Sequence, residues 1–198
     1  MKNIKIVFLG ADRVGKTTLI EYTKKKIEAE NNTVISFFLG WKKFHNPILR
    51  LFSKIHMSRK NKKIEEKSRL ARYKSRSWFF YLVYYFELWI RYVKILNSKA
   101  QYILIDRYFY DELVFSKGLK FKLFKLITPK PDICFILKAP LNEFKKRGSI
   151  ESEADIEKFY KTLSKTSSLC KTVELDSSIS VKRIYNKLRK ELIYLPCR

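Results

Sequence analysis

Apolar residues gather in short runs along this chain, and longer segments with helical spacing separate them. The runs are rich in β-branched and aromatic residues, which favour strands, and they cover residues 4–9, 33–39, 101–105, 132–137 and 171–175. Between the runs, apolar positions recur every three or four residues, which predicts helices over 16–30, 77–97, 153–166 and 180–192. This alternation predicts a parallel sheet with helices on both faces and a ligand site beyond the carboxyl ends of its strands.

The segment that follows the first predicted strand, GADRVGKTT, fits the phosphate-binding pattern G-x-x-x-x-G-K-[ST]. Glycines let the backbone turn its N–H groups toward an anion, and the helix that follows adds its dipole. Lys16 is expected to reach the β- and γ-phosphates, and the hydroxyl of Thr17 is expected to bind Mg²⁺. The nucleotide-binding residues predicted in this way are Gly10, Ala11, Asp12, Arg13, Val14, Gly15, Lys16, Thr17 and Thr18.

The third predicted strand runs into the segment DRY at the same edge of the sheet. An apolar strand that ends in an acid is typical of a carboxylate that holds Mg²⁺, directly or through water, and this assigns Asp106 to the metal. The alternative is a helix cap or a salt bridge to its neighbour. Arg107 is a planar donor suited to clamping a phosphate, although an arginine at a strand end is often only a surface charge.

The loop and the segment DRY together resemble the thymidylate kinase family of P-loop nucleoside monophosphate kinases, whose motifs are G-x-D-x-x-G-K-[ST]-T and D-R-[YF]. The resemblance extends through residues 131–147 and 173–188. It implies an α/β, three-layer P-loop kinase fold with a five-stranded parallel sheet and helices on both faces. It also implies a single domain over 1–198, with a lid region at about 141–155.

The resemblance assigns roles to individual residues. Asp12 would face the acceptor nucleotide, and Arg107 would grip the phosphate of that acceptor. Arg13 matches a loop arginine that acts on the transferring phosphoryl group in some members, and Arg147 stands where a lid arginine would close over ATP. The family usually has only one of these two arginines, and an arginine in a basic run is more often solvated. The catalytic candidates are Lys16, Arg13, Asp106 and Arg147.

The acceptor is the least defined part of the prediction. The family usually carries an R-E-P-G-type segment after the second strand, whereas residues 38–52 here read FLGWKKFHNPILRLF. The resemblance implies transfer from ATP, with Mg²⁺, to a nucleoside monophosphate, with dTMP the leading candidate. Two alternatives stay open: a P-loop kinase for another phosphorylated or anionic acceptor, such as a sugar or lipid precursor, and a nucleotide-binding protein without turnover.

The chain carries a net charge of +24, and its basic residues cluster in an insertion over 41–77. Within 59–76, Glu65 and Glu66 are the only acidic residues. A segment this basic predicts either a solvated loop or a weak contact with an anionic membrane or nucleic acid.

The apolar segment 78–96 is too short and too charged to span a membrane. It predicts a core helix or a homodimer helix, with Glu87 and Arg91 as a pair one turn apart. The alternative turns both residues toward the acceptor, so Arg91 is also a candidate acceptor-binding residue.

Cysteine and histidine are sparse. The spacings of Cys134, Cys170 and Cys197 suggest neither a zinc site nor a disulfide framework, and His45 and His56 are too isolated for a metal cluster. No basic-then-apolar signal segment precedes the first strand. These features predict a cytoplasmic protein.

Overall fold

The computed structural model describes residues 3–40, 78–113, 119–148, 151–164 and 168–194. The basic insertion over 41–77, with His45 and His56, lies outside the described residues, and so does Cys197.

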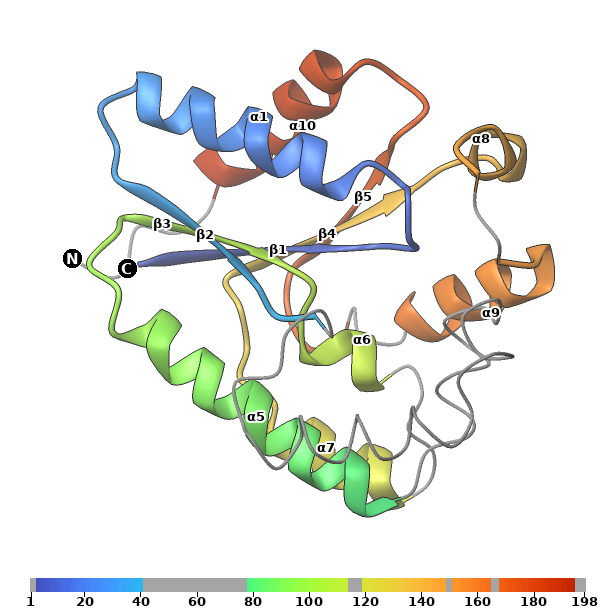
Figure 1. The fold of residues 1–198 in the computed structure, drawn as a ribbon. Helices are drawn as coiled ribbons and strands as arrows, with labels where there is room; N and C mark the ends of the chain where they lie inside the picture. The colour runs from blue at the N-terminus through green and yellow to red at the C-terminus, as the bar shows by residue number, and fades with distance from the viewer. Residues whose placement is uncertain (1–2, 41–77, 114–118, 149–150, 165–167, 195–198) are drawn as a thin grey trace.

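Five parallel strands form one sheet in the order β2-β3-β1-β4-β5. Each strand lies within one or two residues of its predicted position: β1 (Ile4–Leu9), β2 (Val34–Phe38), β3 (Tyr102–Asp106), β4 (Ile133–Lys138) and β5 (Thr172–Asp176). Every pairing in the sheet is parallel. The predicted α/β fold with a five-stranded parallel sheet is therefore confirmed (Figure 1).

Helices cover both faces of this sheet, as predicted. On one face lie α1 (Lys16–Ala29) and α10 (Val181–Ile193), and on the other lie α5 (Trp78–Leu96), α6 (Phe109–Leu113) and α7 (Leu119–Ile127) (Figure 1). After β4 come α8 (Leu141–Lys146) and α9 (Glu153–Leu163). The helices α6, α7 and α8 were not predicted, because each is too short for a clear 3.6-residue period.

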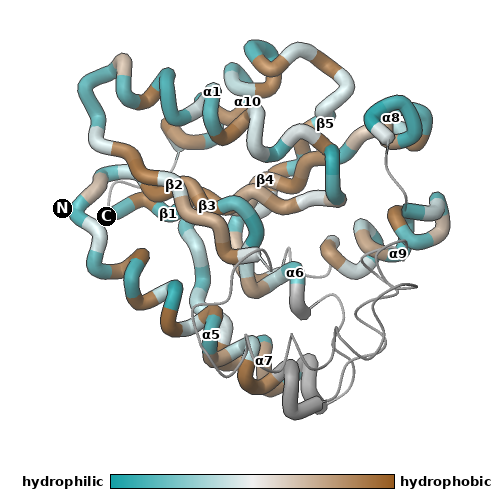
Figure 2. The backbone as a smooth tube through the Cα atoms, viewed as in Figure 1, coloured by the Kyte–Doolittle hydropathy of each residue, from teal (hydrophilic) through white to brown (hydrophobic). Residues whose placement is uncertain are grey.

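The core lies around the three central strands. In β4, the residues from Ile133 to Leu137 are almost completely buried, and the last four residues of β1 are fully buried (Figure 2). Continuous burial requires continuous apolar sequence, which is why these strands read as unbroken apolar runs. The edge strand β2 instead alternates between inward and outward residues. The rigid centre of the sheet therefore carries the residues that follow β1, β3 and β4.

The aromatic helix α5 packs one side on this core. Tyr84, Tyr85 and Tyr92 are buried, whereas Phe86 is 63% exposed. The predicted ion pair is present, with Arg91 Nη2 2.9 Å from Glu87 Oε1. In the part of the chain that the structure describes, no helix is both long enough and apolar enough to cross a membrane.

Candidate active site

The phosphate-binding loop connects β1 to α1 at the centre of the sheet. Gly10 has a φ of 146°, and a Cβ atom there would lie 2.7 Å from the carbonyl oxygen of Leu137 at the end of β4. Gly15 has a φ of 97° and stands at the N-cap of α1. Glycine is required at the first position by this close approach and at the second by the left-handed backbone.

The side chain of Lys16 lies along the loop and is almost completely buried. Its Nζ atom donates hydrogen bonds to the carbonyl oxygens of Gly10, at 3.0 Å, and Ala11, at 2.7 Å. A charge-assisted bond to a phosphate oxygen is stronger than a bond to a neutral carbonyl. Lys16 is thus positioned to donate to the phosphates of a nucleotide while the loop carbonyls hold it, because an ammonium group has three N–H donors.

Two oxygen atoms that could bind a metal ion lie close together between α1 and β3. The Oγ1 atom of Thr17 lies 3.5 Å from Oδ2 of Asp106, to which it donates. A hydroxyl and a carboxylate suit Mg²⁺, which takes oxygen ligands and completes its shell with water and substrate phosphates. Within the described residues, no group of three or more His, Cys, Asp or Glu side chains could hold a metal. The hydroxyl of Thr17 and the carboxylate of Asp106 are the two groups here whose chemistry fits Mg²⁺ bound to nucleotide phosphates.

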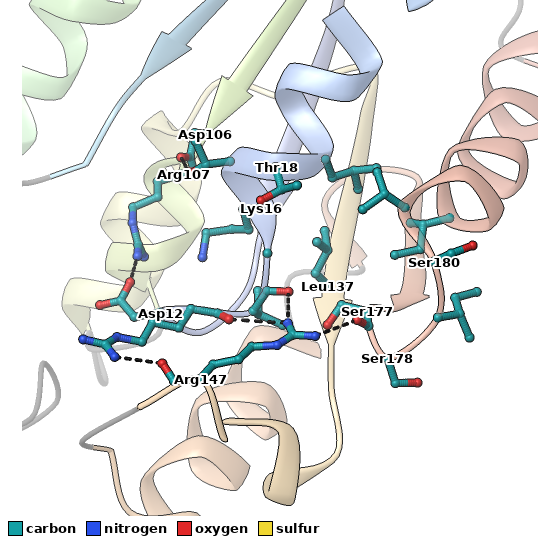
Figure 3. Close-up of a pocket in the computed structure, with 18 of the residues that line it drawn as sticks. Asp12, Lys16, Thr18, Asp106, Arg107, Leu137, Arg147, Ser177, Ser178 and Ser180 are labelled. Atoms are coloured by element: carbon teal, nitrogen blue, oxygen red, sulfur yellow. Dashed lines mark hydrogen bonds and ion pairs between the residues drawn. The ribbon is translucent and has the colours of Figure 1, made fainter. Parts of the chain in front are cut away.

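Arg107 lies between two carboxylates beside the loop. It forms an ion pair with Asp12 (Figure 3). It also forms one with Asp111 in α6, with Nη1 3.1 Å from Oδ2. The side chain of Arg107 is 11% exposed and that of Asp111 is 2% exposed, whereas Asp12 is 44% exposed. Buried charges persist when they are paired, so these acids fix the direction of the guanidinium. Asp111 is not among the site residues that the sequence predicts.

The loop arginine and the lid arginine hold each other through backbone atoms. Arg13 Nη1 donates to the carbonyl oxygen of Arg147 at 2.8 Å. In return, Arg147 donates to the carbonyl oxygens of Val14 and Ser177, each at 3.1 Å (Figure 3). Arg147 therefore connects the loop to the segment between β5 and α10, and it is not the solvated side chain that its basic surroundings suggested.

The segment after β5 is ordered by its own side chains. The backbone N–H and the hydroxyl of Ser178 both donate to Oδ1 of Asp176, at 2.8 and 2.6 Å. These bonds lower the pKa of Asp176, so its carboxylate stays charged near neutral pH. This turn begins the segment that carries Ser177, Ser178 and Ser180 near Arg147 (Figure 3).

Most of these groups line one cavity of about 820 Å³ at the carboxyl edge of the sheet. Its volume is in the range of small-molecule sites. Residues 12–19 line it together with Asp106, Arg107, Arg147 and the segment 177–181. Most of the predicted site residues thus meet in one place.

Comparisons with known proteins agree with this geometry. The family model described as thymidylate kinase matches residues 8–192. This chain belongs to the thymidylate kinase family. It is a nucleoside monophosphate kinase, and the predicted resemblance is confirmed. No curated protein sequence matches the chain.

Solved structures show the same fold for this family member. A thymidylate kinase from Candida albicans has 16% identity and a TM-score of 0.63, with 96% of this chain and 91% of that chain covered. A thymidylate kinase from Ehrlichia chaffeensis has 18% identity and a TM-score of 0.58, with 97% and 100% covered. At such identities, the likeness establishes the fold alone.

Three of the site residues predicted from the sequence do not line the cavity: Gly10, Ala11 and Arg91. The two loop residues lie behind its wall, where their carbonyls hold Lys16. Arg91 is buried, with Nε and Nη2 on Glu87 and Nη1 2.9 Å from the carbonyl oxygen of Gly40. Its role toward the acceptor stays a prediction.

The sequence analysis missed several site residues, among them Phe38 and Tyr160. The other cavity-lining residues that it did not predict are Leu19, Leu137, the segment 177–181 and Ile184. Phe38, at the end of β2, lines the cavity, and Tyr160 of α9 contacts the loop from behind. Phe38 looked like an ordinary residue of an apolar strand, and Tyr160 looked like part of an amphipathic helix. Neither contact has a local signal, because the partners are distant in the sequence.

Proposed function

We propose that this protein transfers the γ-phosphoryl group of ATP, with Mg²⁺, to dTMP. The observation that supports it is the cavity, which is lined by Lys16 and Arg13 of the loop and by Arg107, the partner of Asp12. The chain offers positive charge both where ATP phosphates bind a P-loop and where a phosphorylated acceptor would approach. Such a reaction requires positioning and charge neutralisation more than covalent help from the protein.

The residues divide the work between donor and acceptor. The backbone of residues 10–18 and Lys16 hold the β- and γ-phosphates, and Arg107 orients the phosphate of dTMP for in-line attack. An oxygen of that phosphate is the nucleophile, so no strong general base is needed. Mg²⁺ held by Thr17 and Asp106 would neutralise charge on the transferring group. Arg91 is proposed as a further acceptor-side residue, by way of the segment after β2 that it contacts.

Arg13 is proposed as the catalytic arginine, and Arg147 as the arginine that closes over ATP. The support for Arg13 is its place in the loop, at the position of the family's loop arginine, and in the lining of the cavity. The support for Arg147 is its pair of bonds to the loop and to Ser177. In this proposal the chain is a single domain, with 41–77 as an insertion and about 141–155 as the lid.

A homodimer through α5 and a cytoplasmic location complete the proposal. Phe86, Val93 and Leu96 of α5 are exposed, and so is Leu126 of the neighbouring α7. Exposed apolar patches of this kind mark protein interfaces. The free thiols of Cys134 and Cys170 suit a reducing compartment. Any weak contact of 59–76 with anionic membrane or nucleic acid should weaken steeply as salt rises.

A panel of nucleoside monophosphates, assayed with ATP and Mg²⁺, tests the central proposal. Fastest turnover with dTMP supports it. Faster transfer to another phosphorylated compound would show that this compound, and not dTMP, is the acceptor. ATP hydrolysis without transfer to any acceptor would contradict the kinase reaction. Omission of Mg²⁺ should abolish turnover.

A further inference from the structure

One peptide group of the phosphate-binding loop is held on both sides by side chains. The peptide between Gly10 and Ala11 presents its carbonyl oxygen to Lys16 Nζ, at 3.0 Å. Its N–H donates to the hydroxyl oxygen of Tyr160 in α9, at 3.3 Å. Because the two groups of a planar trans peptide point in opposite directions, a partner that fixes the N–H also fixes the carbonyl.

The hydroxyl of Tyr160 has a fixed position of its own. It donates to the carbonyl oxygen of Leu137 at 2.7 Å, the same atom against which Gly10 packs. Burial raises the pKa of Tyr160, so the hydroxyl is neutral at any assay pH and keeps its proton. A neutral hydroxyl donates one hydrogen bond and accepts others, which matches the bonds to Leu137 and Ala11.

The loop needs such a constraint because it begins with glycine. Gly10 lies in a backbone region that other residues rarely adopt, and glycine can take several alternatives at little steric cost. A rotation of the peptide that follows Gly10 would turn the carbonyl away from Lys16. The hydroxyl of Tyr160 opposes that rotation, since it would leave the buried N–H of Ala11 without its partner.

We propose that Tyr160 is a positioning residue for Lys16, acting through the peptide between Gly10 and Ala11. This inference rests on the proposed function insofar as Lys16 binds the phosphates of ATP. It assigns a role to α9, which the sequence places after the lid region and which supplies no residue to the lining of the cavity.

The first experiment compares Tyr160→Phe with Tyr185→Phe. Both changes remove a hydroxyl from a tyrosine that packs in a helix, but the Tyr185 hydroxyl has no hydrogen-bond partner among the described residues. Displacement of a fluorescent ATP analogue gives the Kd for ATP, and steady-state assays give kcat and KM. Tyr160→Phe should weaken ATP binding and lower kcat, each by roughly five- to tenfold, with the KM of the acceptor unchanged. In Tyr185→Phe, the Kd for ATP, kcat and KM should each stay within about twofold of their values in the unmodified protein.

The second experiment asks whether Tyr160 acts through Lys16. In a double-mutant cycle on ATP affinity, Tyr160→Phe should have no further effect once Lys16→Ala is present. Additive effects would overturn the inference, and so would a Tyr160→Phe protein that is less stable to urea but normal in ATP affinity and kcat. If no nucleoside monophosphate is phosphorylated while the cycle on ATP affinity is non-additive, the proposed function fails and the inference stands.

Discussion

The two halves of the cavity hold their arginines in different ways. On the side proposed for the phosphoryl donor, Arg13 and Arg147 donate to neutral backbone carbonyls, and Glu143 lies 3.7 Å from Arg147. On the side proposed for the acceptor, Arg107 is buried between the carboxylates of Asp12 and Asp111. One half is tied by bonds that an incoming phosphate can readily replace, and the other by buried ion pairs.

The difference predicts which half rearranges when ligands bind. A phosphate oxygen competes well with a neutral carbonyl, so the donor arginines can turn toward ATP at little cost. The acceptor arginine can exchange the exposed Asp12 for a phosphate, but it keeps the buried Asp111. We therefore expect a donor side that closes around its ligand and an acceptor side that is preorganised.

The largest expected effect is a loss of kcat when Lys16 is replaced, because both halves of the cavity act on the phosphates that this lysine is proposed to bind. Lys16→Ala should lower kcat about a thousandfold or more, because the lysine neutralises charge on the phosphates in a water-poor site. Circular dichroism should show an intact fold, since Lys16 lies along the loop and donates to loop carbonyls. Near-normal turnover of this variant would contradict the assignment of the loop to ATP.

Arg107→Ala should impair the use of the acceptor much more than the binding of ATP. Loss of a charge-assisted phosphate contact should lower kcat/KM for the acceptor by roughly 100-fold, with little change in the Kd for ATP. The variant should also lose about 3–5 kcal/mol of unfolding free energy in urea, because Asp111 loses its buried counter-charge.

Two further variants serve as controls for Arg107. Arg107→Lys keeps a positive charge and should recover much of the stability but less of the activity. Arg189→Ala removes an exposed salt bridge with Glu30 and should change neither the stability nor the activity by much. An equal loss of ATP affinity in Arg107→Ala would move this residue to the donor half.

The two arginines proposed for the donor side should affect different kinetic constants. Arg13→Ala should lower kcat by roughly 10- to 100-fold with smaller changes in either KM, because its contact strengthens as charge develops in the transition state. Arg147→Ala should mainly raise the KM for ATP. The reverse pattern in steady-state kinetics would give the catalytic role to the lid.

The smallest effect on activity is expected at the opposite edge of the sheet. Cys134 in β4 and Cys170 before β5 lie near the amino ends of these strands, with their sulfur atoms 3.2 Å apart. The Cys134 thiol lowers the pKa of Cys170 to about 7, whereas burial raises the pKa of Cys134. The thiolate is the nucleophile, so alkylation of Cys170 should accelerate as pH rises through about 7.

Mass spectrometry of a Cys197→Ser protein would follow this reaction, with Cys170→Ser as the control. Turnover should be unchanged after alkylation, because the modified edge lies away from the cavity. A large loss of kcat would mean that the two edges of the sheet are coupled.

The local features of this protein were predictable from its sequence. The strands showed as apolar runs because both faces of the sheet are covered, and the phosphate-binding loop showed as a motif because its working parts are contiguous in residues 10–18. Asp106 and Arg107 were found for the same reason, since they directly follow a strand whose place in the sheet could be inferred.

The contacts between distant segments were decided by the tertiary structure alone. The bond from Ala11 to Tyr160 and the bond from Arg13 to Arg147 each join residues more than 130 positions apart. The order of the strands is equally non-local, and it brings Asp12 of the loop after β1 to Arg107 at the end of β3, which is 95 positions along the chain. A linear pattern specifies which face of an element is apolar, but packing decides which polar groups meet, because each must find its partner across the folded core.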